Sequence, residues 1–510
     1  MHLPTVLVLL ISLALASTTI PAYKCITYDV PTDFALLPYL TKNFDSSVPA
    51  VQLGSRRSTA KAPVSSSFQL LSTFNQSALL HSKTPLVLVA DTPITPDLES
   101  FFLTSHIKAP VYIVPSTDYT HDLATSSSSP LYFSIKSPEG MKVKSSNSAV
   151  NLIVQTQGLK LELAEPEQHE EFKEEDQQEG GKVKQTNTIL LASQLTSLSA
   201  FPSLPTDSLS FSNSVLLQSL RHVSSYISTY GSHFNVQGLF TSGGVEMNYK
   251  GLGYHLKREE FNKRNEVEYE LGVVIGDLNP ESDELYLRGS LENSQTSKFI
   301  ESLKESLSKV LPGVRLITSF DSINFDWCGL NYFNNLSIPA IHLSTTQDFS
   351  FYLKKNFNTS TINSSEKAVD YIKLLTDTVI SYATNTPSDV DSKEFDLDSF
   401  KYFEQIFSST PRSLPYFNEM KFKKSQYFIE VIEDFLTQNV SSLVSRTVIS
   451  HSNFWSSPTF YVSKGTNMVV YEPASLVDQV IAVCFTTFYV VLAYYLIVIR
   501  KPIEKKLKKR

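Results

Sequence analysis

One stretch near the carboxyl end constrains this chain more than any other. Residues 480–499 are twenty consecutive residues without a charge, which is the length that an α-helix needs to cross the hydrocarbon core of a bilayer. The segment that follows, 500–510, holds seven basic residues and one acidic residue. Basic residues beside a span stay in the cytosol, so we expect the body of the chain on the other side of the membrane. The sequence predicts a transmembrane helix at 480–499 and a cytosolic basic tail at 500–510.

The amino end carries a second, shorter apolar stretch. Residues 3–16 have the length of a signal-peptide h-region, and Ala14 and Ala16 supply the small residues of a cleavage site after Ala16. The region before it holds only the start amine and His2, so an uncleaved anchor is the alternative. Together the two stretches predict a signal peptide at 1–16 and a single-pass type I membrane protein whose bulk is lumenal.

The composition between these stretches is that of an ordinary globular protein. Hydrophobic residues make up 42% and charged residues 19%, and the formal net charge is -7, which excludes the basic surface that nucleic-acid binding requires. Acidic and amide residues dominate 162–179. Such a run buries too little apolar surface to fold, so we interpret 151–185 as an acidic linker.

Apolar runs before the linker predict a smaller α/β domain over 17–150. Residues 85–91 and 109–116 are continuous apolar runs bounded by Pro or Asp, as buried parallel strands are. Residues 96–107 have helical spacing, which completes a βαβ unit.

A second and larger α/β region, 186–385, follows the linker. Predicted strands alternate with predicted helices there, which indicates a mixed sheet with helices on both faces. The strands are expected at 187–193, 234–242, 269–278, 314–320 and 338–344, and the helices at 213–229, 297–311 and 365–383.

Residues 386–470 read as a lumenal helical module between this sheet and the membrane. The predicted fold class is therefore α/β: a mixed sheet with helices on both faces, preceded by a smaller α/β domain and followed by a helical module and one transmembrane helix.

Cysteines and sequons fit a lumenal location. Cys25 and Cys328 either form a disulfide or remain two separate buried thiols, while Cys484 lies in the predicted span. Candidate N-glycosylation sites are Asn75, Asn335, Asn358, Asn363 and Asn439.

The usual hydrolase motifs are absent. The sequence has no G-x-S-x-G, no H-E-x-x-H and no phosphate-binding glycine loop. His342 lies in an apolar run, where a core imidazole is the favoured interpretation over a metal ligand.

The segment 239–251, LFTSGGVEMNYKG, carries the most information about ancestry. With 205–220 and 273–278 it resembles the zinc-dependent aminopeptidase family and, within it, the nicalin family. Further matching segments are Tyr28–Asp29 near the mature amino end, VYIVPSTD in the first domain, S-G-G-x-x-x-N-Y-x-G from Ser242, and 470–495 into the span. The related nicastrin family is the less favoured match, because it is larger and far richer in cysteine. The resemblance implies the aminopeptidase-like fold.

The resemblance also implies where a metal site would lie. A two-zinc site needs His, Asp and Glu ligands and a general-base Glu. By position, these ligands and the base fall on Ser193, Leu195, Asp207, Gly243, Gly244, Asp277 and Thr345. Two carboxylates without imidazole or general base are a poor zinc site, so we expect no cofactor, no metal and no catalysis. Asp207 and Asp277 are then interpreted as capping residues, and the two glycines as a tight turn.

The resemblance implies a scaffold subunit of an endoplasmic reticulum membrane complex. Its partners in that family are the nodal modulator protein and a small multi-spanning membrane protein. The assembly lies beside the protein-conducting channel and assists insertion of multi-pass membrane proteins. The alternatives are a lumenal receptor that binds peptide or glycan in the vestigial cleft, and an active metallo-aminopeptidase.

Two features of the carboxyl end bear on that assembly. Thr486, Thr487 and Tyr489 are polar residues inside the predicted span and are candidates for a helix–helix contact, unless the threonines bond to their own helix. Lys506 and Lys508 fit a K-x-K-x-x retrieval pattern for the endoplasmic reticulum, or serve only as a basic flank.

Overall fold

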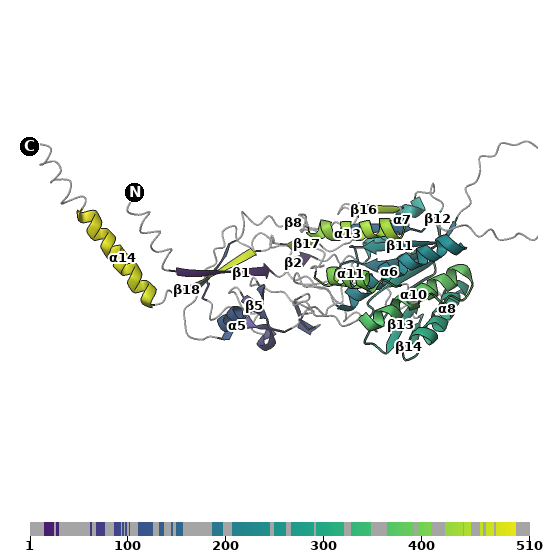
Figure 1. Cartoon of the computed structure of the whole chain (residues 1–510), viewed down its shortest axis with the longest axis horizontal. Helices are drawn as coiled ribbons and strands as arrows, with labels where there is room; N and C mark the ends of the chain where they lie inside the picture. The colour runs from purple at the N-terminus through teal and green to yellow at the C-terminus, as the bar shows by residue number, and fades with distance from the viewer. Residues whose placement is uncertain are drawn as a thin grey trace, which may run out of the picture.

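A computed structural model of the chain shows an elongated molecule with a large α/β domain at one end and α14 at the other (Figure 1). The structure describes residues 15–24, 27–29, 62–63, 68–76, 86–92, 94–95, 97–98, 101–102, 111–125, 132–136, 144–145, 149–156, 186–196, 207–244, 249–261, 267–289, 292–320, 328–347, 365–391, 395–409, 424–441, 443–449, 459–462, 466–473 and 476–495.

An eight-stranded sheet forms the centre of the large domain. Its order is β14-β13-β15-β12-β10-β11-β9-β16. Strands β15, β12, β10 and β11 are parallel neighbours, whereas β9 and β16 are antiparallel at one edge and β13 is antiparallel to β15. The strands are β9 (Ala149–Gln155), β10 (Thr186–Gln194), β11 (Asn235–Thr241), β12 (Val267–Ile275), β13 (Glu284–Gly289), β14 (Arg315–Ser319), β15 (Ala340–Ser344) and β16 (Val444–Ile449).

Helices cover both faces of this sheet, as the alternating pattern predicted. On one face, α6, α8, α10, α11 and α13 form a single core with strand side chains such as Leu271 and Val273. On the other face, α7 and α9 contact each other, and Phe333 of α9 lies over Gly272, where an added Cβ would stand 2.3 Å from the ring. The helices are α6 (Asp207–Tyr230), α7 (Lys250–Phe261), α8 (Ser294–Val310), α9 (Leu330–Asn335), α10 (Ser365–Thr384), α11 (Leu397–Ser409) and α13 (Lys424–Asn439).

Local sequence explains where α8 begins. The Asn293 side chain accepts a bond from the Thr296 N–H at 2.9 Å, and the Thr296 hydroxyl accepts one from the Asn293 N–H at 3.0 Å. This reciprocal capping box satisfies two of the amides that a helix start leaves without partners. Phe299, Leu303 and Leu307, four residues apart, then face the core.

A seven-stranded sheet of order β3-β7-β18-β1-β6-β5-β4 forms the smaller domain. Its β4, β5 and β6 are parallel, which agrees with the predicted βαβ unit. At its centre β1 pairs antiparallel with β18 from Leu15 opposite Pro473 to Ala22 opposite Thr466, so the two ends of the chain share this sheet. Its elements are β1 (Leu15–Lys24), β3 (Ala62–Pro63), β4 (Phe68–Leu70), β5 (Leu86–Ala90), β6 (Val111–Pro115), α5 (Asp118–Thr125), β7 (Tyr132–Lys136) and β18 (Thr466–Pro473).

A third, three-stranded sheet lies between the two domains in Figure 1 and again joins both ends of the chain. Its order is β2-β17-β8, formed by β2 (Thr27–Asp29), β17 (Thr459–Val462) and β8 (Lys144–Ser145). The large domain is thus an insertion between the amino-terminal and carboxyl-terminal parts of the smaller one.

This topology corrects the predicted domain boundaries. β9 belongs to the large sheet although the sequence placed 151–185 in a linker, because the strand pairs with β11 before the acidic run starts. The predicted helical module 386–470 contains α11 and α13, but β16 joins the large sheet while β17 and β18 join the other two. These strands have long-range partners, so local periodicity gives no signal for their pairing.

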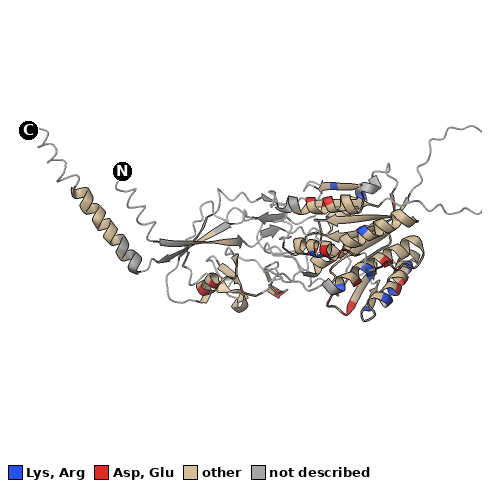
Figure 2. Cartoon of the chain, in the orientation of Figure 1, with Lys and Arg blue, Asp and Glu red and all other residues tan. Residues whose placement is uncertain are grey.

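The carboxyl-terminal helix is α14 (Leu476–Tyr494), separated from β18 by only residues 474 and 475. Its described apolar side chains are largely exposed, for example Val483 at 64% and Phe488 at 63%. Figure 2 shows the described part of α14 in tan, without a basic or acidic residue. Within the described part of the chain, no helix combines the length and the apolar character that crossing a bilayer needs.

Several sequence predictions fall outside the described residues. They are the residues of the signal stretch before 15, most of the helix at 96–107, the acidic run, Cys25, Asn358, Asn363, Lys506 and Lys508.

Candidate functional site

The positions that the aminopeptidase resemblance singled out come together at one edge of the large sheet. Ser193 is the second-last residue of β10, Gly243 and Gly244 follow β11, Asp277 follows β12, and Thr345 follows β15. These four strands are parallel, so their carboxyl ends meet at the same edge, where open α/β sheets bind ligands. Leu195 is buried beside them, and Asp207 is the first residue of α6, although its side chain lies outside the described set.

Asp277 is the one carboxyl group among these positions whose side chain is described, and it is fully buried. Its Oδ1 accepts hydrogen bonds from the hydroxyls of Ser344 at 2.9 Å and Thr346 at 2.7 Å, and its Oδ2 has a longer contact of 3.4 Å with the Thr345 hydroxyl. The Thr345 N–H donates to the Asp277 carbonyl at 2.8 Å, which ties β15 to β12. We refer to Asp277, Ser344, Thr345 and Thr346 as the Asp277 cluster.

The electrostatics of the Asp277 cluster favour a protonated carboxyl group. Burial raises the pKa of Asp277 to about 7, although the three hydroxyl donors act in the opposite direction. Desolvation dominates because hydroxyls are neutral dipoles and do not replace the hydration of a charged carboxylate. A catalytic zinc ligand needs the reverse, a carboxylate held ionised.

Amide and hydroxyl side chains occupy the space beside Ser193. The Ser193 hydroxyl donates to Asn213 Oδ1 at 3.2 Å, and Asn213 Nδ2 donates to the carbonyls of Gln194 at 3.1 Å and Leu209 at 2.8 Å. All four residues are buried. Asn213 therefore binds the end of β10 to the first turns of α6 through groups that carry no charge.

Gly244 leaves no room for the glutamate that an active relative would carry at this position. A Cβ on Gly244 would stand 2.4 Å from Gln194 Oε1 and 2.8 Å from Gln194 Cβ. The chain also turns here, because the Tyr249 N–H donates to the Gly244 carbonyl at 2.7 Å and the Gly243 N–H to the Thr241 hydroxyl at 3.1 Å. Glycine is thus required at 244 by close packing rather than by an unusual φ.

The described residues at this edge do not fit a two-zinc centre. No three His, Cys, Asp or Glu side chains come together anywhere in the described part of the chain. The donors at the edge are neutral hydroxyls and amides already bonded to one another, and Asp277 has its oxygens engaged. Zinc prefers imidazole, thiolate and carboxylate, so we derive no chemistry through a metal here.

His342 takes the structural place that its apolar run suggested. It is fully buried in β15, and its ring fills the space beside Gly276, where a Cβ would stand 2.6 Å from Nε2. Burial, with a smaller effect from Arg288, lowers the pKa of His342 to about 3. The imidazole is therefore neutral at every physiological pH and belongs to the core.

The remaining predicted positions are scattered over the molecule. Cys328 is buried next to α9 and Cys484 is exposed on α14. The Thr487 hydroxyl donates to the Val483 carbonyl of its own helix at 2.8 Å, as the alternative to a helix–helix contact predicted for the threonines. The side chain of Tyr489 is 45% exposed. The side chains of Asn75 and Asn335 are exposed and that of Asn439 is half-buried.

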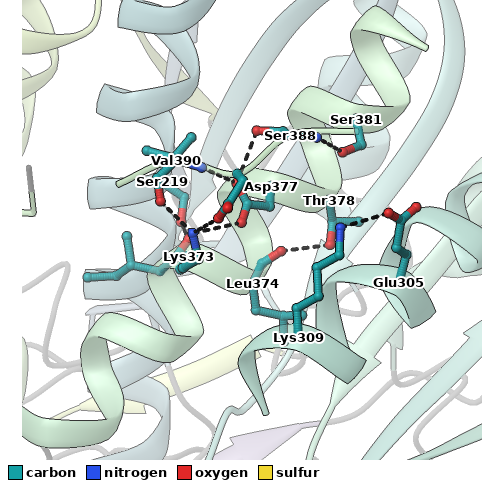
Figure 3. Close-up of polar contacts among 12 residues, drawn as sticks. Ser219, Glu305, Lys309, Lys373, Leu374, Asp377, Thr378, Ser381, Ser388 and Val390 are labelled. Atoms are coloured by element: carbon teal, nitrogen blue, oxygen red, sulfur yellow. Dashed lines mark hydrogen bonds and ion pairs between the residues drawn. The ribbon is translucent and has the colours of Figure 1, made fainter. Parts of the chain in front are cut away.

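Sequence reasoning did not find a second buried polar group, which lies along α10 (Figure 3). Asp377 Oδ1 accepts from the Ser388 hydroxyl and the Val390 N–H, each at 3.0 Å, and its Oδ2 lies 3.4 Å from Lys373 Nζ. Lys373 Nζ also pairs with Asp389 at 2.6 Å and donates to the Val390 carbonyl.

These contacts fasten the segment after α10 back onto the helix. The Ser388 N–H donates to the Ser381 hydroxyl at 2.9 Å, so residues 373, 377 and 381, four apart on one helix face, each hold part of 388–390. We refer to Lys373, Asp377, Ser381, Ser388, Asp389 and Val390 as the α10 clamp. Every charge in it is paired, which indicates a structural role.

Comparison with known proteins identifies a fold. No protein-family model matches the sequence, and no curated protein matches it. Among solved structures, the crystal structure of nicastrin, described as a γ-secretase component, matches with a TM-score of 0.58 at 11% identity, over 89% of this chain and 99% of that one. An aminopeptidase from Aneurinibacillus sp. strain AM-1 has a TM-score of 0.29 at 9% identity over 76% and 88%. The Legionella aminopeptidase LapA has 0.27 at 11% over 41% and 54%.

The nicastrin match covers nearly the whole of both chains, so the shared fold includes the smaller domain as well as the large sheet. The match shows a fold shared with nicastrin and agrees with the predicted mixed sheet covered by helices. The TM-scores of the two aminopeptidases are too low to support an argument.

Proposed function

We propose that this chain is a non-catalytic, membrane-anchored scaffold subunit of an endoplasmic reticulum complex. In the nicalin-like form of this proposal its partners are a nodal modulator-like protein and a small multi-spanning membrane protein. The complex works beside the protein-conducting channel in the biogenesis of multi-pass membrane proteins. The large domain supplies a lumenal docking surface, and residues 480–499 supply the membrane anchor.

The filled edge of the large sheet is the observation that carries the proposal. The described side chains where ligands would stand are bonded to protein groups: Ser193 to Asn213, and Ser344 and Thr346 to the buried carboxyl group of Asp277, whose pKa burial raises to about 7. A general base would need a carboxylate or imidazole that reaches substrate, whereas Asp277 is fully buried. The same burial argues against an active aminopeptidase and against a receptor that binds peptide or glycan in an open cleft.

The exposed apolar side chains of α14 support the anchor. Exposed apolar surface of this extent is costly in water and indicates a lipid or protein environment. Only two residues separate α14 from β18, and β18 is paired on both sides. An anchor attached in this way would hold the smaller domain close to the membrane surface.

Affinity purification of the full chain from detergent-solubilised membranes tests the proposal. We expect the nodal modulator-like partner and the multi-spanning partner to co-purify in stoichiometric amounts. Metal analysis should find no zinc. Recovery of the chain alone would contradict the scaffold, and one or two bound zinc ions per chain with peptide hydrolysis would establish the enzyme instead.

Replacing 480–499 by polyleucine separates the anchor from the contact surface. Because Thr487 bonds to its own helix, Tyr489 is the stronger candidate for an interhelical hydrogen bond, which is worth about 0.6 to 2 kcal/mol in membranes. We expect the polyleucine chain to insert and fold but to lose the multi-spanning partner. Full retention of that partner would assign the contact to the lumenal domain.

A further inference from the structure

Two sequons of the large domain occupy the same kind of position, which makes them a matched pair. Asn335 is the last residue of α9 and Asn439 is the last residue of α13, and each is followed two residues later by a serine. An N-glycan is attached through the side-chain amide nitrogen and is bulky and hydrated, so it requires a surface position. The two asparagines differ in their surroundings.

The fold uses the Asn439 sequon for its own contacts. Asn439 is half-buried, and its Nδ2, the atom that would carry the sugar, donates to the Phe435 carbonyl at 3.0 Å. The next residue, Val440, is 9% exposed, and its carbonyl accepts the Ser224 hydroxyl of α6 at 2.6 Å. The hydroxyl of Ser441 accepts from the Leu443 N–H at 3.1 Å. All three sequon residues are thus held between α13, α6 and the start of β16.

The Asn335 sequon faces solvent instead. Asn335 and Ser337 are both exposed. The bonds in this turn are made by the backbone, from Leu336 N–H to the Phe333 carbonyl at 3.0 Å and from Ser337 N–H to the Asn334 carbonyl at 3.0 Å. A sugar on Asn335 Nδ2 would therefore displace none of these hydrogen bonds.

We infer that the folded protein carries an N-linked glycan on Asn335 and none on Asn439. The inference rests on the lumenal placement of the large domain in the proposed function. The glycan would stand at the amino end of β15, opposite the edge that holds the Asp277 cluster. It would keep protein partners away from that end of the domain.

The test uses the full chain produced in cells with a eukaryotic secretory pathway, with glycosidase-sensitive mobility and glycopeptide mass spectrometry as readouts. Asn335→Gln and Ser337→Ala should each remove the same single mobility step. Asn334→Gln, at an exposed neighbour outside the sequon, should leave mobility unchanged, as should Asn439→Gln. Glu292→Asn, at an exposed position just before α8, creates a new sequon with the exposed Ser294 and should add one step.

The Glu292→Asn variant separates the two possible failures. If it gains no glycan, the lumenal placement is contradicted and the proposed function fails with it. If it gains a glycan while Asn335→Gln loses none, or if a glycopeptide at Asn439 is recovered from folded protein, the inference is overturned and the proposed function stands.

Discussion

The Asp277 cluster and the α10 clamp both bury an acidic side chain, and they do so in different ways. Asp277 is fully buried among neutral hydroxyls. Asp377 is 3% exposed and lies against the ammonium group of Lys373. Burial raises the pKa of Asp277 to about 7, so that side chain depends on a proton, whereas Asp377 depends on a cation. The difference shows two ways in which this fold accommodates a buried carboxyl group: neutral hydroxyls with a raised pKa at Asp277, and an ion pair at Asp377.

Gly244→Glu should cause the largest loss of stability, because it places a glutamate at the sheet edge that holds the Asp277 cluster. The new Cβ would collide with Gln194, at an overpacking cost of about 1–3 kcal/mol. The buried carboxyl group adds a desolvation penalty, so we expect a loss of more than about 3 kcal/mol. Urea denaturation measures the loss.

The control is Gly313→Glu, since a Cβ on Gly313 meets nothing within 4 Å. A stable Gly244→Glu protein that binds zinc would show that the edge is an open metal site, and the comparison with the α10 clamp would fail.

Lys373→Met should destabilise the large domain by about 3 kcal/mol. The substitution leaves Asp377 buried with only the Ser388 and Val390 donors, and an uncompensated buried charge costs about 3–5 kcal/mol. Lys309→Met is the control, because Lys309 makes an exposed pair with Glu305 on α8 (Figure 3) and such pairs contribute little. Equal stability of the two variants would contradict the role of the cation; recovery in Lys373→Met/Asp377→Leu would support it.

Asp277→Asn should remove the pH dependence that this carboxyl group gives to unfolding. The folded-state pKa of about 7 lies above the ordinary value of 3.8, so the folded protein keeps a proton that the unfolded chain has released. This contribution is complete below pH 3.8 and is lost as the pH rises through about 7. From pH 5 to pH 8 the unmodified chain should lose about 2–3 kcal/mol relative to the variant.

Urea denaturation at pH 5, 6, 7 and 8 checks this prediction. Asn retains one acceptor oxygen for Ser344 and Thr346 and places an N–H₂ donor toward Thr345, so the variant should fold. Parallel stability curves for the two proteins would show that Asp277 is already ionised at pH 5.

Ser344→Ala should have the smallest effect, a loss of about 1 kcal/mol at pH 5, where its hydroxyl bonds to a neutral carboxyl group. At pH 8 the acceptor is charged, and the loss should rise toward about 2 kcal/mol. Ser308→Ala, on the exposed side of α8, is the control and should change nothing. A loss that is independent of pH would indicate that Ser344 acts on the turn at Thr346 rather than on Asp277.

The sequence predicted the parts of the fold that have strong local patterns. Strands β10, β11, β12 and β15 each contain a short apolar run, and α6, α8 and α10 have long amphipathic patterns. β13 was missed because Tyr286 and Arg288 give it a mixed composition, although its buried and half-buried residues alternate. β16 was missed because it follows α13 closely and pairs with β9, far away in sequence.

The sequence could predict where in the fold the candidate site lies, but not which side chains form its hydrogen bonds. The carboxyl ends of parallel strands converge, so Ser193, Gly244, Asp277 and Thr345 could be expected at one edge. Their partners could not, because Asn213 comes from inside α6 and Thr346 from beyond β15. The α10 clamp had no motif, since its residues are ordinary polar side chains that meet only when the chain reverses after α10.

The position of β18 at the centre of the smaller sheet has a consequence for biosynthesis. β18 separates β7 from β1, yet it is made after the large domain and immediately before α14. At about 5–20 residues per second, the ribosome needs on the order of tens of seconds to travel from β1 to β18. During that interval β1 and β7 wait in the growing chain with unpaired strand edges, the kind of surface that chaperones protect. Closure of this sheet therefore has to wait until β18 has been synthesised, after the whole of the large domain that lies between β1 and β18 in the sequence.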